Sequence, residues 1–330
     1  MLRLLHSRAD RRTDWDSVLG RQLLDGTEDV SAGDVGSLFV ELGDRKAWRE
    51  FCRDHAAAFR KRRALERFLA WSQEPFTISG FNALIEKPVL FAVDYLYSAE
   101  PVDGFRLPNW RERVVCPETG LINRIRGTLL AISHLLRPRQ LAKVRVYATE
   151  QVTPFFTWLR QVNPSVIGSE YLGPAVPPGG SRDGIRNEDL TRLSFADASF
   201  DLVVTNDVLE HVPTYAEAYR ELFRVLAPGG LLVFTVPFDL SCDEHLIRAR
   251  VNAAGEVEHL LPPEYHGDPV NSQDGVLCYQ VFGWKMMKEL RDVGFSRTGA
   301  LTYWSLVHGL LGPDQCVFFA VKPVAGQSRR

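Results

Sequence analysis

The second half of the chain alternates short apolar segments with helical segments, and this alternation constrains the fold more than any other feature of the sequence. We expect strands at residues 144–147 and 165–168, and continuous apolar strands at 200–205 and 231–236. A short apolar run without polar alternation is typical of a strand that is buried on both faces of a parallel sheet. The pattern therefore predicts an α/β fold with a doubly wound, mostly parallel sheet.

Helices are expected between these strands. One covers residues 155–161, and Thr214 with Glu217 forms a capping-box pattern that predicts the start of another. A final helix at 281–293 and strands at 300–306 and 316–321 close the predicted sheet. Residues 237–275 form a long insertion with little regular pattern, rich in proline, histidine and acidic residues. A segment of this length is more often functional than passive.

The part of the chain before the alternating pattern divides into two further regions. Residues 1–72 are predicted to be helical, with Asp44 as the N-cap of a long helix. Residues 73–136 contain short strand patterns followed by a helix, which indicates a small β-rich module with a connecting helix. We therefore expect three domains, at 1–72, 73–136 and 137–330, with the 237–275 insertion in the third.

Charge and cysteine content exclude several classes of protein. The chain has 39 Lys and Arg against 41 Asp and Glu, and a dedicated nucleic-acid binder would have an excess of basic residues. No apolar run approaches the roughly 20 residues that span a bilayer. Five cysteines without a C-x-x-C pair fit a reducing compartment. We predict a cytoplasmic protein with no nucleic-acid partner and no membrane span, and the oligomeric state stays open.

A series of motifs between residues 189 and 237 resembles the class I S-adenosylmethionine-dependent methyltransferases, of the type 11 group. These motifs are Asp189 followed by Leu190, S-F-D-L-V-V at 199–204, V-L-E-H-V at 208–212 and P-G-G at 228–230, in this order. The resemblance implies a Rossmann-like, seven-stranded sheet and a transferase activity. It also implies S-adenosylmethionine as the cofactor, and we expect a small-molecule or glycan acceptor.

The resemblance assigns roles to acidic residues that follow the predicted strands. Ligands of open parallel sheets bind beyond the carboxyl ends of the strands. Glu170 matches the acid that holds the ribose hydroxyls, and Asp189, with Leu190, matches the position that accepts the adenine amino group. Asp207 and Val208 match residues around the methionine portion.

The loop after the first predicted strand departs from the family pattern. The family has an acid-x-G-x-G motif there, whereas residues 147–154 contain no glycine. Glu150 remains able to meet the cofactor's ammonium group, and Thr149 or Thr153 its carboxylate. The T-E-Q-V-T-P and G-S-E-Y-L segments, at 149–154 and 168–172, resemble a bacterial subgroup, in which this loop is a variant.

The bacterial subgroup has a four-cysteine zinc ribbon ahead of the enzyme domain, and residues of this chain before its own predicted enzyme domain resemble that ribbon. The chain keeps one of four cysteine ligands, Cys116, and the other positions fall on Asn82, Ile85 and Thr119. One thiolate cannot hold a tetrahedral structural zinc ion. We therefore expect a degenerate ribbon that apolar packing holds together without metal.

Methyl transfer to oxygen or nitrogen can require a base, and histidines are the natural candidates. We consider His266, with its neighbour Tyr265, and His211 as catalytic residues, although His211 also suits a structural role at a helix start. His245 and His259 are expected to be packing or solvated residues.

Two alternatives to a methyltransferase follow from the same residues. A chain that lost cofactor binding would be a non-catalytic binding module. Several residues of the insertion and its flank supply zinc-type ligands for a metal-dependent enzyme: Cys242, His245, His259, His266 and Cys278. Their spacing matches no compact motif, so we predict no metal site.

Overall fold

The structure is a computed structural model that describes residues 4–5, 38–102, 104–136, 141–270, 275–313 and 315–324. The chain forms two compact units. The first contains residues 1–41, 46–135 and 301–316, and the second contains 42–45, 136–300 and 317–330. Residues 301–316, which the sequence pattern assigns to the third domain, thus belong to the first unit. Within the described residues, no helix has the length and apolar character that crossing a bilayer requires.

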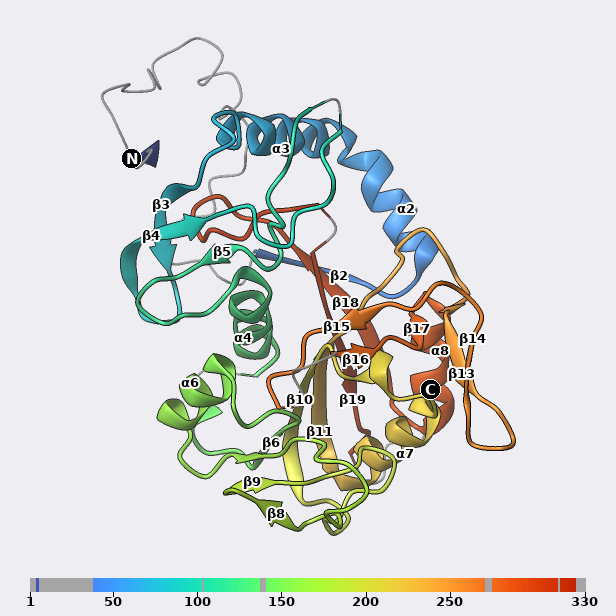
Figure 1. The fold of residues 1–330 in the computed structure, drawn as a ribbon. Coiled ribbons are helices and arrows are strands. Elements are labelled where there is room, and N and C mark those ends of the chain that lie inside the picture. The colour runs from blue at the N-terminus through green and yellow to red at the C-terminus, as the bar shows by residue number, and fades with distance from the viewer. Residues whose placement is uncertain are drawn as a thin grey trace. The chain divides into compact units, whose positions relative to one another are not determined.

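The central sheet has seven strands in the order β2-β18-β19-β11-β10-β6-β7 (Figure 1). Strands β7, β6, β10 and β11 pair in parallel, and β19 is antiparallel to β11. This arrangement confirms the predicted α/β class with a mostly parallel sheet. The strands are β2 Phe39–Leu42, β6 Val146–Ala148, β7 Ile167–Gly168, β10 Phe200–Asn206, β11 Leu226–Thr235, β18 Arg297–Tyr303 and β19 Cys316–Val321.

Burial on both faces explains the apolar runs of the central strands. In β10, residues 202–205 are all buried, and so are residues 231–235 of β11. Figure 1 shows α6 on one side of these strands and α7 with α8 on the other. The helices of this unit are α6 Pro154–Val162, α7 Tyr215–Val225 and α8 Lys285–Val293, with a short 3₁₀ turn, η2, at Leu209–His211.

The starts of two helices differ in how they are capped. Thr153 caps α6, because its hydroxyl accepts a hydrogen bond from the backbone N–H of Phe156 at 3.2 Å. Thr214 precedes α7 as predicted, but its side chain makes no capping hydrogen bond. The capping box expected there is therefore wrong in detail, although the helix starts at the predicted place.

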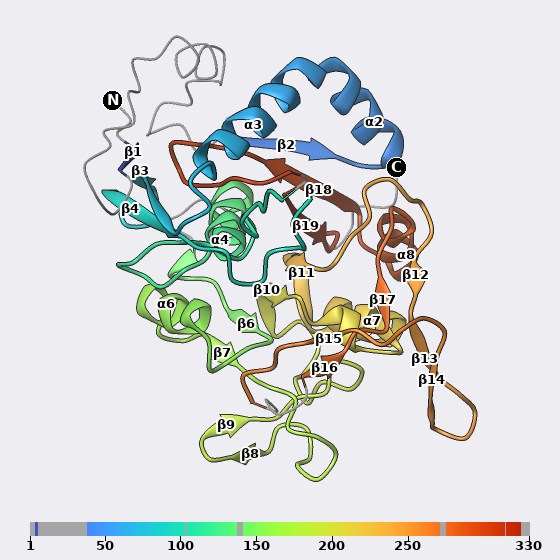
Figure 2. The ribbon, with the colours of Figure 1, turned by 45° about the horizontal axis from the view of Figure 1, so that its top comes forward.

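The insertion at 237–275 contains more regular structure than its sequence suggests. Three short antiparallel ladders form in or from it, and Figure 2 shows the hairpin of β13 and β14 projecting from the rest of the unit. Gln280 holds β17 against η2, because its amide donates to the carbonyl oxygens of Leu209 and Val212. The strands are β12 Leu246–Ile247, β13 Ala249–Val251, β14 Val257–His259, β15 Tyr265–His266, β16 Val276–Leu277 and β17 Gln280–Val281, with a separate hairpin of β8 Ser181–Arg182 and β9 Ile185–Arg186 earlier in the unit.

The first unit combines helices with a four-stranded sheet in the order β1-β3-β4-β5. Residues 39–42 form β2 in a region predicted to be helical, so this part of the prediction is wrong. The expected long helix starts right after Asp44 but is interrupted at His55. The elements are β1 Leu4–Leu5, α2 Arg45–Asp54, α3 Ala56–Leu69, β3 Phe76–Asn82, β4 Lys87–Val93, β5 Val114–Val115 and α4 Asn123–Leu135.

The guanidinium of Arg126 is buried in this unit and donates several hydrogen bonds to backbone carbonyl oxygens. Its Nη1 donates to the carbonyl oxygens of Val114 and Leu121 at 2.6 and 3.0 Å, and its Nη2 donates to that of Gly309 at 2.6 Å. It also stacks over the ring of Phe91 at 4.3 Å. Burial lowers the pKa of Arg126 to about 10. One side chain thus links α4, β5 and the 301–316 segment.

Three of the four positions that match ribbon ligands, Asn82, Ile85 and Cys116, lie close to one another. Asn82 donates a hydrogen bond to the Cys116 sulfur at 3.2 Å, and Ile85 packs against the apolar cluster that contains Cys116. Burial raises the pKa of the Cys116 thiol, but hydrogen bonds from Thr119 and Asn82 outweigh this effect and leave the pKa below its usual value. Hydrogen bonds and apolar contacts therefore connect these residues, and the ribbon itself stays a prediction.

We predict that Arg126→Met strongly destabilises the first unit. The change keeps much of the apolar stem but leaves several buried carbonyl oxygens without donors. The expected loss is about 3 kcal/mol or more in the free energy of unfolding. Urea denaturation followed by circular dichroism measures it. The control Arg250→Met removes an exposed arginine and should change stability by about 0.5 kcal/mol or less. Equal stability of the two variants would contradict the role of Arg126.

Candidate active site

Polar side chains gather where three neighbouring strands end. Glu150 follows β6, Glu170 follows β7, and Asn206 is the last residue of β10. Ala148 of β6 pairs with Gly168 of β7 and with Val204 of β10, so the carboxyl ends of the three strands are nearly level. Because parallel strands end on the same edge, these side chains come from adjacent positions of one sheet edge.

Glu150 is held in place by both of its carboxylate oxygens. The side-chain amide of Asn206 donates to Oε1 at 2.7 Å, and the hydroxyl of Thr153 donates to Oε2. Thr153 is also the cap of α6, so the carboxylate is tied to the helix start. The neighbouring Thr149 is buried, and its hydroxyl has no hydrogen-bond partner among the described residues. This loop therefore presents a fixed negative charge beside β10.

The carboxylate of Glu170 bridges β7 and the loop after β6. Its Oε1 accepts hydrogen bonds from the backbone N–H groups of Gln151 at 2.6 Å and Val152 at 3.1 Å. Burial raises the pKa of Glu170, and the negative charges of Glu150 and Asp268 add to this effect, while the two backbone hydrogen bonds oppose it. Glu170 thus lies within the electrostatic reach of both the β6 loop and the insertion.

Asp189 and Leu190 lie in a segment that runs beside Glu170. Glu170 forms a parallel bridge with Asn187, two residues before Asp189. Asp189 Oδ1 accepts hydrogen bonds from the backbone N–H and the hydroxyl of Thr191, at 2.9 and 2.7 Å. Leu190 is buried. The segment therefore combines an oriented carboxylate with an apolar side chain.

The loop after β6 makes its turn without glycine, because none of residues 147–154 has a positive φ angle. The close approach occurs in the neighbouring strand. A Cβ atom at Gly168 would lie 2.7 Å from the carbonyl oxygen of Glu150 and 2.4 Å from the ring of Phe156. The glycine that this edge of the sheet requires is thus Gly168.

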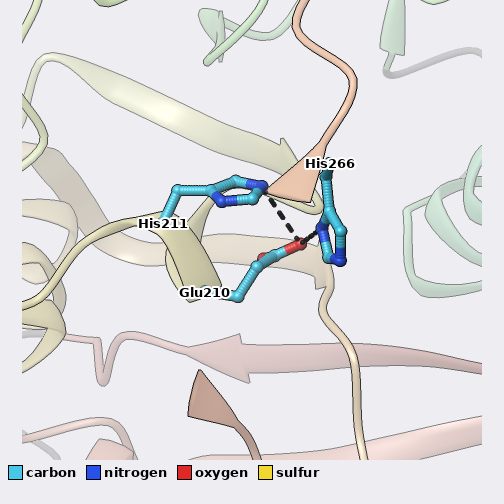
Figure 3. Close-up of side chains that lie close together, drawn as sticks. All are labelled: Glu210, His211 and His266. Atoms are coloured by element: carbon cyan, nitrogen blue, oxygen red, sulfur yellow. Dashed lines mark ion pairs between the residues drawn. The ribbon is translucent and has the colours of Figure 1, made fainter. Parts of the chain in front are cut away.

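A second group of polar residues contains Glu210, His211 and His266 (Figure 3). Glu210 and His211 belong to η2, shortly after β10, and His266 belongs to β15. Glu210 Oε1 lies 3.7 Å from His211 Nε2 and 3.6 Å from His266 Nδ1. Burial raises the pKa of Glu210, and the contact with Glu210 raises the pKa of His266.

The outward nitrogens of both imidazoles have partners. His211 Nδ1 lies 2.9 Å from the carbonyl oxygen of Leu277, and His266 Nε2 lies 3.1 Å from Glu264 Oε1. A carbonyl or a carboxylate oxygen only accepts, so each outward nitrogen carries the hydrogen. In a neutral ring the inward nitrogens therefore point a lone pair at Glu210.

The other residues considered from the sequence have surroundings of their own. His245 Nε2 pairs with Glu289 at 2.9 Å, while its Nδ1 accepts from the backbone N–H of Gly283. His259 and Cys242 are exposed. Tyr265 precedes His266 in β15, with 53% of its surface exposed. Asp207 has φ of 50° at the end of β10, next to Val208, and its negative charge acts on Glu210.

Sequence reasoning missed Glu210, Asn206 and Glu264 as site residues. Glu210 stands in the V-L-E-H-V motif, where an acid beside a histidine is a usable signal, but no local pattern indicates its contact with His266 of β15. Asn206 ends a continuous apolar strand, which could have marked it as a residue at the strand tip. Nothing in the local sequence of Glu264 indicates its contact with His266.

Comparison with known proteins places this part of the chain in a family. Residues 155–234 match the family described as "Methyltransferase domain". Sterol 24-C-methyltransferase ERG6A of Gibberella zeae is 40% identical over 165 residues, which cover 40% of this chain and 42% of that protein. The arsenite methyltransferase of Aquipseudomonas alcaligenes is 42% identical over 59 residues, 18% of this chain and 16% of that protein.

These similarities cover only part of this chain and of its relatives. The chain spans less than half of the length of these curated relatives. A solved S-adenosylmethionine-dependent methyltransferase from Mesorhizobium loti is 19% identical with a TM-score of 0.38, and covers 58% of this chain and 96% of its own. The matched segment contains β7, β10, α7 and all but the last residue of β11. Glu170 and Asp189 lie between β7 and β10, and Asp207 follows β10. Residues 155–234 therefore match a methyltransferase domain, and in this region the chain is similar to S-adenosylmethionine-dependent methyltransferases.

Proposed function

We propose that the chain transfers a methyl group from S-adenosylmethionine to a small-molecule or glycan acceptor. The observation that carries this proposal is the set of polar side chains at the level ends of β6, β7 and β10, within and beside the segment that matches the methyltransferase domain. A nucleoside cofactor with a charged amino-acid end requires such an edge, because it must be bound at several separate polar groups.

Each polar group has a proposed partner on the cofactor. Glu170 binds the ribose hydroxyls. Its Oε1 already accepts two backbone hydrogen bonds, whereas its Oε2 accepts none from the described residues and is available for the ribose. Asp189 accepts from the adenine amino group while Leu190 packs against the ring. Glu150 pairs with the ammonium group. Residues nearer the methionine portion complete the proposed site: Thr149, Asp207 and Val208.

The proposed mechanism depends mainly on positioning. S-adenosylmethionine supplies a methyl group that its sulfonium has already activated. The chain's contribution is to hold donor and acceptor in line and to exclude water, which can account for most of the acceleration. Asn206 and Thr153 support this role, because they keep the Glu150 carboxylate in one orientation.

We place the acceptor beside His211 and His266. His211 lies in η2, shortly after the end of β10, and His266 contacts Glu210 of the same turn. A histidine there is suited to take a proton from an acceptor. A catalytic role for Tyr265 stays a prediction, as do the cytoplasmic location and the bacterial subgroup.

The two alternatives are not favoured. A non-catalytic module is what the glycine-free loop first suggested, but that loop needs no positive φ angle and holds its acid firmly. A different enzyme on this fold would not explain why the chain's relatives in the matched region are methyltransferases.

We predict that Glu170→Ala and Asp189→Ala each weaken binding of S-adenosylmethionine. Each change removes a charge-assisted hydrogen bond to the cofactor, so the dissociation constant should rise roughly tenfold or more. Isothermal titration calorimetry measures this. The control Glu258→Ala removes an exposed acid that pairs with Arg250, and it should leave the affinity unchanged. Unchanged affinity in both site variants would remove the assignment.

Cofactor binding should also weaken at low pH. The ionised form of Glu170 is the one that accepts two hydroxyl hydrogens, and its pKa lies above the usual 4.5. Affinity is therefore full above this pKa and is lost as the pH falls through it. Titrations at successively lower pH, starting from about pH 7.5, should show the loss, up to roughly tenfold per unit below the pKa. In Glu170→Gln the loss of affinity that comes from protonation of Glu170 should disappear. An identical pH profile in the wild type and in Glu170→Gln would contradict this role of Glu170.

A further inference from the structure

We propose that Glu210, His211 and His266 bind one divalent transition-metal ion, with Zn²⁺ as the probe of choice (Figure 3). The site is separate from the proposed cofactor contacts at Glu150, Glu170 and Asp189. It therefore does not depend on the proposed cofactor site, although it uses the two histidines beside which we place the acceptor.

The first argument is the state of the Glu210 carboxylate. Its side chain is fully buried, and neither oxygen has a hydrogen-bond partner among the described residues. No lysine or arginine of the described chain pairs with it, whereas Asp207 adds a second negative charge nearby. An uncompensated buried carboxylate is costly, so the group must take up a cation or a proton.

The second argument is the orientation of the two imidazoles. Leu277 and Glu264 fix the hydrogen on the outward nitrogen of His211 and His266 respectively. When both rings are neutral, two nitrogen lone pairs and one carboxylate oxygen then converge without a donor between them. Such a set repels itself unless a positive charge lies at its centre. A histidine whose second nitrogen is held by a carboxylate or carbonyl is also the usual arrangement of a metal ligand.

The third argument is distance. The separations of 3.6 and 3.7 Å between Glu210 Oε1 and the two nitrogens are too long for hydrogen bonds. Two ligands of one tetrahedral Zn²⁺ ion lie roughly 3.3–3.5 Å apart, given typical Zn–N and Zn–O bonds. All three ligand atoms lie within 4.8 Å of one another. Small side-chain movements would therefore complete the coordination.

A second group of potential ligands, Glu264, His266 and Cys278, is less suitable. Glu264 is exposed and pairs with Arg248 at 3.1 Å, and the thiol of Cys278 donates to the carbonyl oxygen of Gln280. These groups thus have partners already. In this arrangement Glu264 is the residue that orients His266.

The ligand types select the metal. Two imidazole nitrogens and one carboxylate suit Zn²⁺ and its transition-metal neighbours, whereas Mg²⁺ and Ca²⁺ prefer oxygen. A set of two histidines and one glutamate leaves at least one coordination position for water or another ligand, as in catalytic zinc sites.

Titration of the chelator-treated, full-length chain with ZnCl₂ tests the proposal. We expect one Zn²⁺ per chain, and a binding constant that falls about 100-fold or more in Glu210→Gln and in His266→Asn. Saturating Zn²⁺ should raise the Tm of the wild type by about 5 °C or more and that of Glu210→Gln hardly at all. Mg²⁺ at millimolar concentration should give no binding.

The control is His259→Asn, which removes an exposed histidine of the same insertion and should retain full affinity. Glu210→Gln removes a buried charge with little change of shape, so its metal-free Tm should equal or exceed that of the wild type. Absence of one-to-one binding, or equal affinity in the wild type, Glu210→Gln and His266→Asn, would overturn the proposal.

The same samples separate this inference from the proposed function. Glu170→Ala should lose S-adenosylmethionine affinity but keep Zn²⁺, and His266→Asn should do the opposite. A wild type that binds Zn²⁺ but no S-adenosylmethionine would refute only the proposed function.

Discussion

The parallel pairing of β6 with β7 and β10 determines where the candidate site residues lie. Ala148 pairs with both Gly168 and Val204, so the three strands end at nearly the same level and the polar residues that follow them share one edge. The approach is close enough that a side chain at Gly168 would collide with the Glu150 backbone. The pairing thus explains how a loop without glycine and an acid after the neighbouring strand form one hydrogen-bonded edge.

The parts of this arrangement that could be predicted depend on local patterns. Continuous apolar runs indicated β10 and β11, because strands buried on both faces carry no polar alternation. Once those strands are placed, the acids that follow them must lie on the sheet edge. The family resemblance then supplied roles for Glu170 and Asp189 that their position alone does not provide, and those roles stay predictions.

The rest depends on contacts between distant parts of the chain. Strand β2 is four residues long and has no readable period, so 39–42 looked like part of a helical region. The ladders of the insertion have only two or three pairs each, too few for alternation to be seen. Glu210 contacts His266 of β15, more than fifty residues later in the sequence. Thr214 shows the opposite error, because the local sequence predicts a capping box there but its side chain makes no capping hydrogen bond.

Hydrogen bonds and packing around Arg126 and Cys116 hold the first unit together, while the second unit presents two clusters of acids. In one, Glu150 and Glu170 have donors that fix them; in the other, no described residue donates a hydrogen bond to the Glu210 carboxylate. This contrast supports different ligands for the two clusters. The most direct test of the central claim is a crystal structure with S-adenosylhomocysteine. The account predicts the ribose on Glu170 and the adenine amino group on Asp189. A nucleoside bound elsewhere, or absent at saturating concentration, would contradict it.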